Sequence, residues 1–354
     1  MIPCGIAGAS GSTGAELLRF LNRHPSVEVV RVTADRHAGK PLEEVFPFLR
    51  GHGALTLAKL DIRDLAEACR VVFCALPHTT SMGVVPALVE AGCLVVDLSA
   101  DFRFRDPALY EAWYGVAHTA PALCAQAVYG LPELHRDAIR GARLVANPGC
   151  YPTSVVLAVA PLLRAGLIEP DSIIADSKSG TSGAGRREDL ALSFSELNED
   201  FRAYQVAAHR HTPEMEQELS AIAGQPITCS FTPHLAPMTR GIFSTVYARP
   251  VGEPTEEALQ AVLEEAYAGE PFVLVLPPGE LPATGRVRGT NLCELALRLD
   301  TRTGRAVVLS ALDNLGKGAS GLAVQNANLM LELDETAGLT GPGLFPSGSS
   351  TIWC

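Results

Sequence analysis

A cysteine stands where the sequence predicts that a strand passes into a helix. The motif NPGC (147–150) follows an apolar run, and Pro152 lies in the expected first helical turn, where its missing N–H costs little. The unpaired amides and the positive end of the helix dipole favour the thiolate and lower the pKa of a thiol there. Cys150 is therefore the candidate nucleophile, whereas the other cysteines lack this setting and are interpreted as small buried residues.

Two histidines, His209 and His211, precede a helix indicated by Thr212 as N-cap and Pro213 as its first residue. An imidazole with a near-neutral pKa can deliver or take up a proton. If the segment is extended, period-two alternation points both side chains to the same side. The pattern predicts an acid/base at His209 or His211 without choosing between them, and His234 is interpreted as a structural residue near a sheet edge.

A glycine-rich turn directly after the first apolar run could bind a dinucleotide. Such a turn leaves N–H groups free at a helix N-terminus, where they stabilise a pyrophosphate. The spacing is G-x-x-G-x-x-G, looser than the strict G-x-G-x-x-G, so a turn that serves only the geometry of the chain is the alternative. The residues of this candidate cofactor site are Gly8, Ser10, Gly11, Ser12, Thr13 and Gly14.

The end of the second predicted strand bears on which dinucleotide is bound. An acidic residue there, Asp35, favours a free ribose hydroxyl, whereas the adjacent Arg36 favours a 2′-phosphate. Arg36, together with Lys40, favours NADP over NAD. The alternative is that these are solvated loop charges.

The elements that must position these residues fall into two patterns. Apolar strands alternate with helices in the first part of the chain, which is typical of a parallel sheet buried on both faces, a Rossmann-type α/β domain. Strands are expected at 2–7, 27–33, 71–76, 94–98 and 144–147, and helices at 15–22 and 81–91. The second part predicts an α+β domain with a mixed or antiparallel sheet, with strands at 227–231, 242–248 and 272–276 and a hairpin of 295–299 with 306–311.

These patterns predict three segments. Residues 1–148 form the NADP-binding domain, and residues 149–315 form the domain for catalysis and oligomerisation, opened by a long apolar helix from Cys150. Residues 316–354 contain a helix at about 319–333 that returns to the first domain, followed by a surface tail.

Composition excludes several classes of protein. The chain has 354 residues, of which 47% are hydrophobic and 19% charged, so it can bury a sizeable core. No apolar run reaches the about 18 residues of a membrane span, and a net charge of −11 without a basic cluster disfavours nucleic acid as a partner. An odd number of scattered cysteines suits a reducing compartment, by default the cytoplasm, and no metal site is expected.

Several motifs carry a family resemblance that spans almost the whole chain in order. The chain resembles the N-acetyl-gamma-glutamyl-phosphate reductases of arginine biosynthesis, within the semialdehyde dehydrogenase superfamily. One departure is Ser154, where that family usually has Gly or Ala. The motifs are those at 8–14, 97–103, 129–133, 147–153, 209–214, 233–241 and 313–328.

The resemblance implies an NADP-dependent enzyme that reduces an acyl phosphate to an aldehyde through a thioester on Cys150, with phosphate release, and it implies a homodimer or homotetramer. The substrate would carry a phosphate and an α-carboxylate, which arginine forks bind well. Arg103, at the carboxyl edge of the first sheet, would take the phosphate, and Arg240 would take the carboxylate unless it forms an ion pair instead.

Two glycine-containing segments complete the implied site. The segment 177–183 looks like a flexible anion-binding loop, in which Lys178 would contact the substrate phosphate while Ser182 and Gly183 contact the cofactor. Asn314 and Gly316 would contact the nicotinamide half of the cofactor by the same resemblance, with a simple turn into the last helix as the alternative.

Other functions remain in competition. Aspartate-semialdehyde dehydrogenase and the lysine-pathway reductase that takes a carrier-bound substrate share the chemistry, but the His-Arg-His motif opposes the first, and the negative charge opposes docking of an acidic carrier. A cysteine acyl-transferase without redox chemistry has no use for the glycine turn, and a nucleotide-sensing protein does not need Cys150.

Overall fold

The computed structural model describes residues 1–51, 54–186 and 188–344 and divides them into two compact units. The first unit contains Met1–Pro148 and Ala319–Gly341. The second contains Gly149–Gly318 and the described residues from Pro342 onward. The chain therefore passes between the units after Pro148, after Gly318 and again after Gly341.

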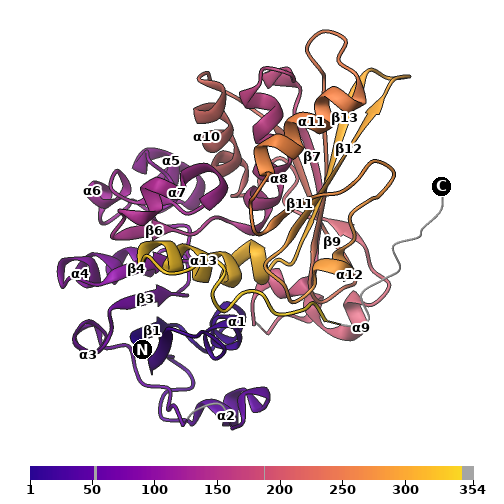
Figure 1. The fold of residues 1–354 in the computed structure, drawn as a ribbon. Coiled ribbons are helices and arrows are strands. Elements are labelled where there is room, and N and C mark those ends of the chain that lie inside the picture. Colours follow the sequence, from indigo (N-terminus) through magenta and orange to yellow (C-terminus); the bar gives the residue numbers. More distant parts are fainter. Residues whose placement is uncertain (52–53, 187, 345–354) are drawn as a thin grey trace. The chain divides into compact units, whose positions relative to one another are not determined.

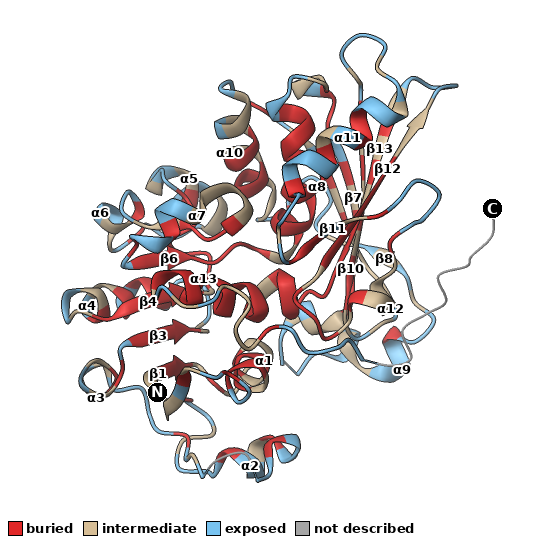
Figure 2. Ribbon diagram, viewed as in Figure 1, coloured by how far each residue is buried: buried red, intermediate tan, exposed pale blue. Residues whose placement is uncertain are grey.

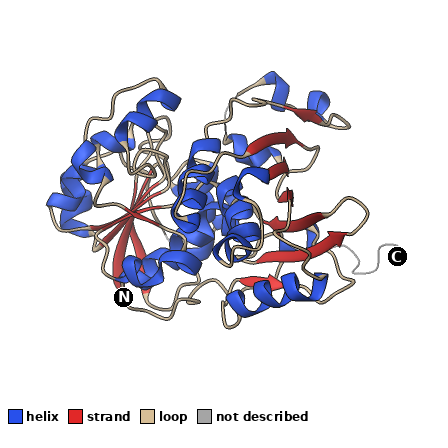
Figure 3. Ribbon diagram, turned by 90° about the horizontal axis from the view of Figure 1, so that it is seen from above, coloured by secondary structure: helices blue, strands red, loops and turns tan. Residues whose placement is uncertain are grey.

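The first unit is built on a six-stranded sheet in the order β2-β1-β3-β4-β6-β5, and every pair of neighbouring strands is parallel. Apolar runs form these strands because their side chains are covered on both faces, and helices stand on both sides of the sheet in Figure 3. The strands are β1 (Ile2–Ala7), β2 (Val27–Val32), β3 (Val71–Cys74), β4 (Leu94–Asp97), β5 (Val128–Tyr129) and β6 (Leu144–Ala146).

The helices of the first unit include one that comes from the far end of the chain. Helix α13 contacts α1, α7 and β4, and all its residues are buried, as Figure 2 shows in red. The helices are α1 (Ser12–Leu21), α2 (Leu42–Val45), α3 (Ile62–Ala68), α4 (Val85–Glu90), α5 (Pro107–Tyr114), α6 (Pro121–Cys124), α7 (Pro132–Arg140) and α13 (Gly321–Met330).

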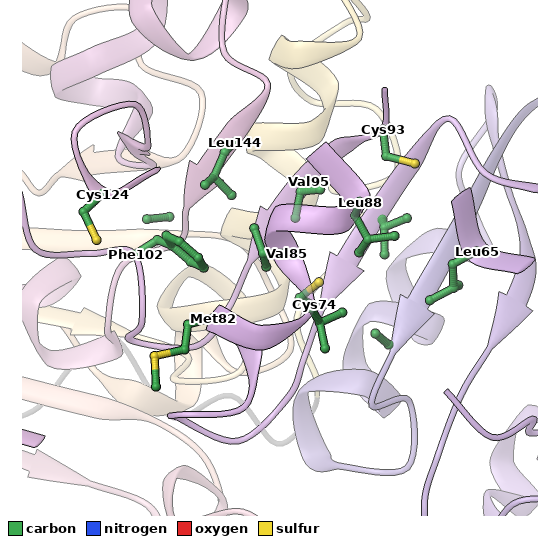
Figure 4. Packing of buried hydrophobic residues seen from close by; sticks show 14 of the residues in the cluster. Leu65, Cys74, Met82, Val85, Leu88, Cys93, Val95, Phe102, Cys124 and Leu144 are labelled. Carbon is green, nitrogen blue, oxygen red and sulfur yellow. The ribbon is translucent and has the colours of Figure 1, made fainter. Parts of the chain in front are cut away.

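A hydrophobic cluster fills one side of this sheet. Leu65 of α3 and Leu88 of α4 pack with Val95 of β4, and Met82 and Phe102 extend the cluster into the loops that follow β3 and β4 (Figure 4). The two loops are therefore anchored in the core at these positions.

The second unit contains a seven-stranded sheet in the order β11-β12-β13-β10-β7-β9-β8. It is mixed: β7 runs parallel to β9, β11 runs parallel to β12, and the other pairs are antiparallel. The strands are β7 (Ile174–Ser179), β8 (Arg202–Ala203), β9 (Ser230–Leu235), β10 (Ile242–Ala248), β11 (Val273–Val275), β12 (Cys293–Asp300) and β13 (Arg305–Leu312).

Helices of the second unit cover one face of this sheet. Helix α8 contacts β10 and β13, α10 and α11 contact α8, and Figure 1 shows all three on the same side of the strands. Buried and half-buried residues alternate along β10, so the opposite face stays partly open. The helices are α8 (Cys150–Arg164), α9 (Phe194–Leu197), α10 (Thr212–Ala223), α11 (Glu256–Tyr267) and α12 (Thr284–Val287).

The predicted fold class, a Rossmann-type parallel sheet followed by a mixed sheet, is confirmed. The expectation of a loop at 177–183 was wrong for its first half: residues 177–179 end strand β7, which is held between β10 and β9. The expected surface tail lies, from residue 345 onward, outside the described residues. None of the described helices has the length and apolarity needed to cross a bilayer.

Candidate active site

Cys150 is the first residue of helix α8 and is half-buried. The N-cap residue, Gly149, has no side chain that could cap the helix. The first backbone amides of α8 therefore have no side-chain acceptor from the N-cap, and they point toward the N-terminal end of the helix, where Cys150 lies. This arrangement stabilises a thiolate through the helix dipole. The other described cysteines are also free thiols, and all of them are buried except Cys229, which is half-buried.

Ser154 anchors this helix one turn below Cys150. Its hydroxyl donates to Ser244 Oγ at 2.8 Å and lies 3.0 Å from Ser310 Oγ, and all three serines are buried. The departure from the usual family residue therefore adds a hydroxyl that bonds α8 to strands β10 and β13.

The backbone of Gly318 lies directly against Cys150. A Cβ at position 318 would be 2.9 Å from the Cβ of Cys150 and 3.2 Å from the carbonyl oxygen of Asp313. Only glycine therefore lets the chain pass this close to Cys150. The sequence showed this glycine in the motif at 313–328, but its role depends on a contact with a residue far away in the chain.

His209 and His211 lie in a turn rather than in the extended segment that the alternation argument assumed. The N-cap of α10 is His211, so the expectation of Thr212 at that position was off by one residue. The turn nevertheless brings the two imidazole rings together, with their centroids 4.8 Å apart. Both rings also form T-shaped contacts with Tyr151, the neighbour of Cys150, with ring centroids 5.5 and 5.9 Å apart.

The two histidines differ in their electrostatics. His209 is buried, and its burial, with a smaller contribution from Arg210, lowers its pKa to about 4. Its Nδ1 accepts a hydrogen bond from the backbone N–H of His211 at 3.1 Å, so the neutral ring carries its proton on Nε2. His209 is thus neutral near pH 7 and has Nε2 as its donor, whereas His211 is half-buried.

Sequence reasoning missed Glu214, which supports the start of the catalytic helix. This residue is in the first turn of α10 and fully buried, and its Oε1 accepts the backbone N–H of Gly149 at 2.7 Å. The carboxylate therefore fixes the residue that precedes Cys150. Its place in the motif at 209–214 was the available signal, but nothing local indicates which amide it binds.

Two tyrosines line the same region. Tyr151 and Tyr204 share a hydrogen bond between their hydroxyl groups at 3.0 Å, and the Tyr204 ring meets the edge of His209. Burial raises the pKa of both phenols, that of Tyr204 to about 12, and the negative charge of the Cys150 thiolate contributes to this rise. Both hydroxyls thus remain protonated, so they are available only as hydrogen-bond donors and acceptors.

Several of the expected cofactor and substrate residues converge at the end of the second sheet. Asn314 donates to Ser182 Oγ at 2.9 Å and accepts the N–H of Gly241, and Gly183 and Gly316 lie in the same loops. Because Gly318 touches both Asp313 and Cys150, this loop cluster borders the nucleophile.

Arg240 forms the ion pair that the sequence left open as its alternative role. Its Nε lies 2.9 Å from the carboxylate of Asp313, which is fully buried and also accepts the N–H groups of Gly289, Leu315 and Gly316. This pairing fixes the direction of the guanidinium within the loop cluster.

Lys178 lies on the other face of the sheet. Ser177 points toward α8, since its hydroxyl bonds Ser244, and alternation along β7 therefore turns Lys178 away from the helix. Its Nζ pairs with Asp176 at 2.6 Å. His234 on the neighbouring strand faces the same carboxylate, with its Nδ1 at 3.3 Å.

The first unit carries the glycine turn. Gly8 has a φ of 85°, and a Cβ there would strike the carbonyl oxygen of Ala75, so the turn and the chain after β3 lie in contact. Helix α1 begins at Ser12 with Gly11 as its N-cap, and no side chain caps it. A Cβ at Gly11 would meet only one atom within 4 Å, the Gly8 carbonyl oxygen at 3.8 Å. This open helix N-terminus fits a pyrophosphate.

Two arginines lie at the carboxyl edge of the same sheet. Arg36 is exposed just after β2, and no described residue forms a hydrogen bond or ion pair with it, so it can meet a 2′-phosphate. Arg103 is buried, and it donates from Nε to the carbonyl of Asn147 at 2.8 Å and from Nη2 to that of Leu98 at 3.1 Å.

Comparison with known proteins gives matches over both units. The sequence model described as the NAD binding domain of semialdehyde dehydrogenase matches residues 3–142, and the one described as its dimerisation domain matches residues 150–314. The N-acetyl-gamma-glutamyl-phosphate reductase of Desulforudis audaxviator is 54% identical over 346 residues, covering 98% of this chain and 100% of that protein. The enzyme of the same name from Moorella thermoacetica is also 54% identical, with the same coverage.

Solved structures share the fold at low sequence identity. Aspartate semialdehyde dehydrogenase II from Vibrio cholerae, complexed with ASA, has a TM-score of 0.72 at 18% identity and covers 94% of this chain and 98% of its own. Aspartate semialdehyde dehydrogenase with NADP from Candida albicans has a TM-score of 0.71 at 17% identity with the same coverage.

Proposed function

This chain belongs to the semialdehyde dehydrogenase family, and we propose that it reduces N-acetyl-gamma-glutamyl phosphate to the semialdehyde with NADPH, releasing phosphate, as a step of arginine biosynthesis. Relatives of that name align over nearly the whole chain. One observation carries the assignment: a cysteine at an uncapped helix N-terminus lies beside a tyrosine that contacts two histidines.

The cofactor is NADP. The glycine turn with the open start of α1 would hold the pyrophosphate, and exposed Arg36 would hold the 2′-phosphate. When bound, the dinucleotide supplies the hydride that reduces the thioester carbon. Ser182, Gly183, Asn314 and Gly316 are proposed to contact its nicotinamide half.

The chain's own residues perform the acyl transfer. The thiolate of Cys150 attacks the acyl carbon, and the bond to the phosphate oxygen breaks, so phosphate leaves with the electron pair and a thioester forms. The oxyanion of the tetrahedral intermediate would accept hydrogen bonds from the first amides of α8 and from Nε2 of His209. Glu214 keeps those amides in place through Gly149.

The reduced thioester needs a proton on its oxygen, and we assign this proton to His211. His209 is neutral at assay pH because its pKa is near 4, and its Nδ1 is occupied by a backbone N–H. When the thiohemiacetal collapses, His211 takes the hydroxyl proton back while the C–S bond breaks and frees both the aldehyde and the thiolate.

Substrate binding and assembly follow as further parts of the proposal. Arg103 is proposed for the phosphate and Arg240, steered by Asp313, for the carboxylate. The direction of Lys178 argues against a contact with substrate at the Cys150 of the same copy. The open face of the second sheet is proposed to pack on another copy in a homodimer or homotetramer, and the free cysteines suit the cytoplasm.

The reverse reaction tests this function directly. Wild-type protein is expected to form NADPH from N-acetylglutamate semialdehyde, phosphate and NADP, followed by absorbance. Cys150→Ser is expected to lose nearly all turnover while its Kd for NADPH stays within about twofold. Absence of phosphate-dependent turnover by the wild type would refute the assignment, and equal turnover with aspartate semialdehyde would refute its specificity.

A further inference from the structure

The loop between β3 and the 3-10 turn at Ser81 contains a strained residue that the proposed mechanism does not use. Thr79 has a φ of 69°, in the left-handed region that a β-branched residue rarely adopts. Residues 77–80 are all exposed, so packing does not impose this conformation. Something else must hold it, because such strain persists only where neighbouring groups over-determine the backbone.

A single buried carboxylate provides that restraint. Asp101 is fully buried, and its Oδ1 accepts the backbone N–H of Thr79 at 2.8 Å while its Oδ2 accepts the N–H of Met82 at 2.9 Å. The hydroxyl of Tyr110 also donates to Oδ1 at 2.8 Å. The two oxygens therefore hold the loop at Thr79, within its exposed part, and at Met82, just beyond it.

Neighbouring groups hold the carboxylate itself in place. Met82 and Phe102 are buried in the hydrophobic cluster of the first unit, as Figure 4 shows, and Phe102 follows Asp101 directly. The side chain of His78 accepts the N–H of Ala100 at 3.1 Å, which joins the loop to the chain before Asp101. The loop thus has a rigid base and an exposed, strained tip.

The position of this loop points to its use. It begins at Ala75, whose carbonyl oxygen fills the space where a Cβ of Gly8 would lie. Because β1 and β3 are adjacent parallel strands, the glycine turn and this loop both leave the carboxyl edge of the sheet, where ligands of such folds bind. Nothing in the glycine turn itself requires Thr79 to be strained.

We propose that Asp101 is a positioning residue of the dinucleotide site, which holds the loop around Thr79 in the strained form that completes the wall beside the glycine turn. The inference rests on the proposed cofactor. Asp101 acts through the backbone of Thr79 and touches no reacting atom. Loss of the carboxylate would release the loop to an unstrained conformation and weaken cofactor binding, while the groups around Cys150 in the other unit are unchanged.

Asp101→Asn tests this, because an amide cannot accept from both N–H groups. We expect the Kd for NADPH, measured by quenching of NADPH or tryptophan fluorescence, to rise about tenfold, a loss in the range for hydrogen bonds to a charged group. The KM for NADP should rise in parallel, and kcat at saturating cofactor should stay within about threefold. Adding Thr79→Gly should recover part of the affinity, because glycine adopts this φ without strain.

Two controls separate positioning from stability. Tyr110→Phe removes a bond to the same carboxylate but leaves both loop N–H groups bound, and Asp106→Asn removes one charge at an exposed helix cap nearby. Both should keep the Kd for NADPH within about twofold, even if the melting temperature of Tyr110→Phe falls. If Asp101→Asn fails to fold, Thr79→Pro replaces it as the test. This substitution fixes φ near −65° at an exposed site, and it is expected to raise the Kd for NADPH in the same way.

The outcomes distinguish this inference from the proposed function. If the wild type binds NADPH and both Asp101→Asn and Thr79→Pro bind it equally well, the inference is overturned while the function stands. If Asp101→Asn binds weakly but Thr79→Gly recovers nothing, the carboxylate serves stability alone and the inference is again overturned. Absence of NADPH binding by the wild type overturns the cofactor assignment and this inference with it.

Discussion

The two units build their candidate sites from different parts of the chain. In the first unit, the candidate cofactor site is mainly backbone, namely an uncapped helix start, a glycine turn and a strained loop at one sheet edge, with Arg36 as a proposed side-chain contact. In the second unit, side chains supply the candidate groups, since Cys150 and the two histidines come from one helix start and one turn. Cofactor affinity and turnover should therefore respond to different substitutions.

The two sheets also differ in how their faces are covered. The first is parallel and has helices on both faces, and ligands of such sheets bind at the carboxyl edge. The second is covered by helices on one face, and its other face is partly open. If cofactor affinity depends mainly on the first unit and turnover mainly on the second, the following substitutions should affect the two quantities separately.

The largest effect on kcat is expected from substitutions in the turn that contains His209 and His211. His211→Asn should lower kcat by about 10² to 10⁴-fold, the usual contribution of a general acid, and should flatten the dependence of kcat on pH near neutrality. His209→Asn should lower kcat by about tenfold or less and keep that pH dependence, because His209 with its pKa near 4 is already neutral there. NADPH binding should be unchanged in both, measured by fluorescence. A flattened pH profile in His209→Asn would reverse the assignment.

The second largest effect on kcat is expected at Glu214, which accepts the N–H of Gly149 just before Cys150. Glu214→Ala leaves the N–H of Gly149 without its charged acceptor, and we expect kcat to fall about 10 to 100-fold with little change in the KM for NADP. Glu214→Gln retains an acceptor oxygen, so its kcat should be close to that of the wild type. The rate at which iodoacetamide alkylates Cys150 should likewise be higher in Glu214→Gln than in Glu214→Ala. Equal damage from both variants would mean that the charge itself acts, rather than the hydrogen bond.

A change at the glycine turn should weaken cofactor binding rather than lower kcat. The added Cβ of Gly8→Ala would strike the carbonyl oxygen of Ala75, and the φ of 85° is unfavourable for alanine. We expect the Kd for NADPH to rise about tenfold or more, with kcat at saturating cofactor nearly unchanged. Gly39→Ala serves as the control, since this glycine also has a positive φ but has no atom near its Cβ position. A fall in kcat without weaker binding would break the separation between the units.

The smallest effect concerns acid stability of the first unit. Burial lowers the pKa of His24, whose Nδ1 accepts the N–H groups of Ser26 and Val27 and whose Nε2 bonds Asn328 of α13. The folded state prefers the neutral ring, so its stabilising contribution is complete above the ordinary pKa of 6.5 and is lost as pH falls toward the lowered value. The melting temperature of the wild type should fall about one to three degrees more than that of His24→Gln between pH 7.5 and 5.5. Equal falls would exclude this contribution.

Much of the candidate chemistry could be predicted from local sequence because local rules govern it. A cysteine after a strand and before an apolar helix, or glycines after a first strand, have their positions set by neighbours along the chain. The strand β7 was missed because its sequence, IADSKS, is polar on one side and lacks a continuous apolar run; its neighbours β10 and β9 stabilise it.

The sequence by itself determined the fold class and placed Cys150 at the start of an apolar helix, since hydrophobic periodicity and turn residues act over a few positions. Tertiary structure decided the rest: Glu214 on the Gly149 amide, Gly318 against Cys150, Lys178 turned away from α8 and a turn that makes the two histidines unequal. The physical reason is that these contacts join residues distant in the chain, and burial and hydrogen-bond partners, which set each group's charge and direction, exist only after the chain has folded.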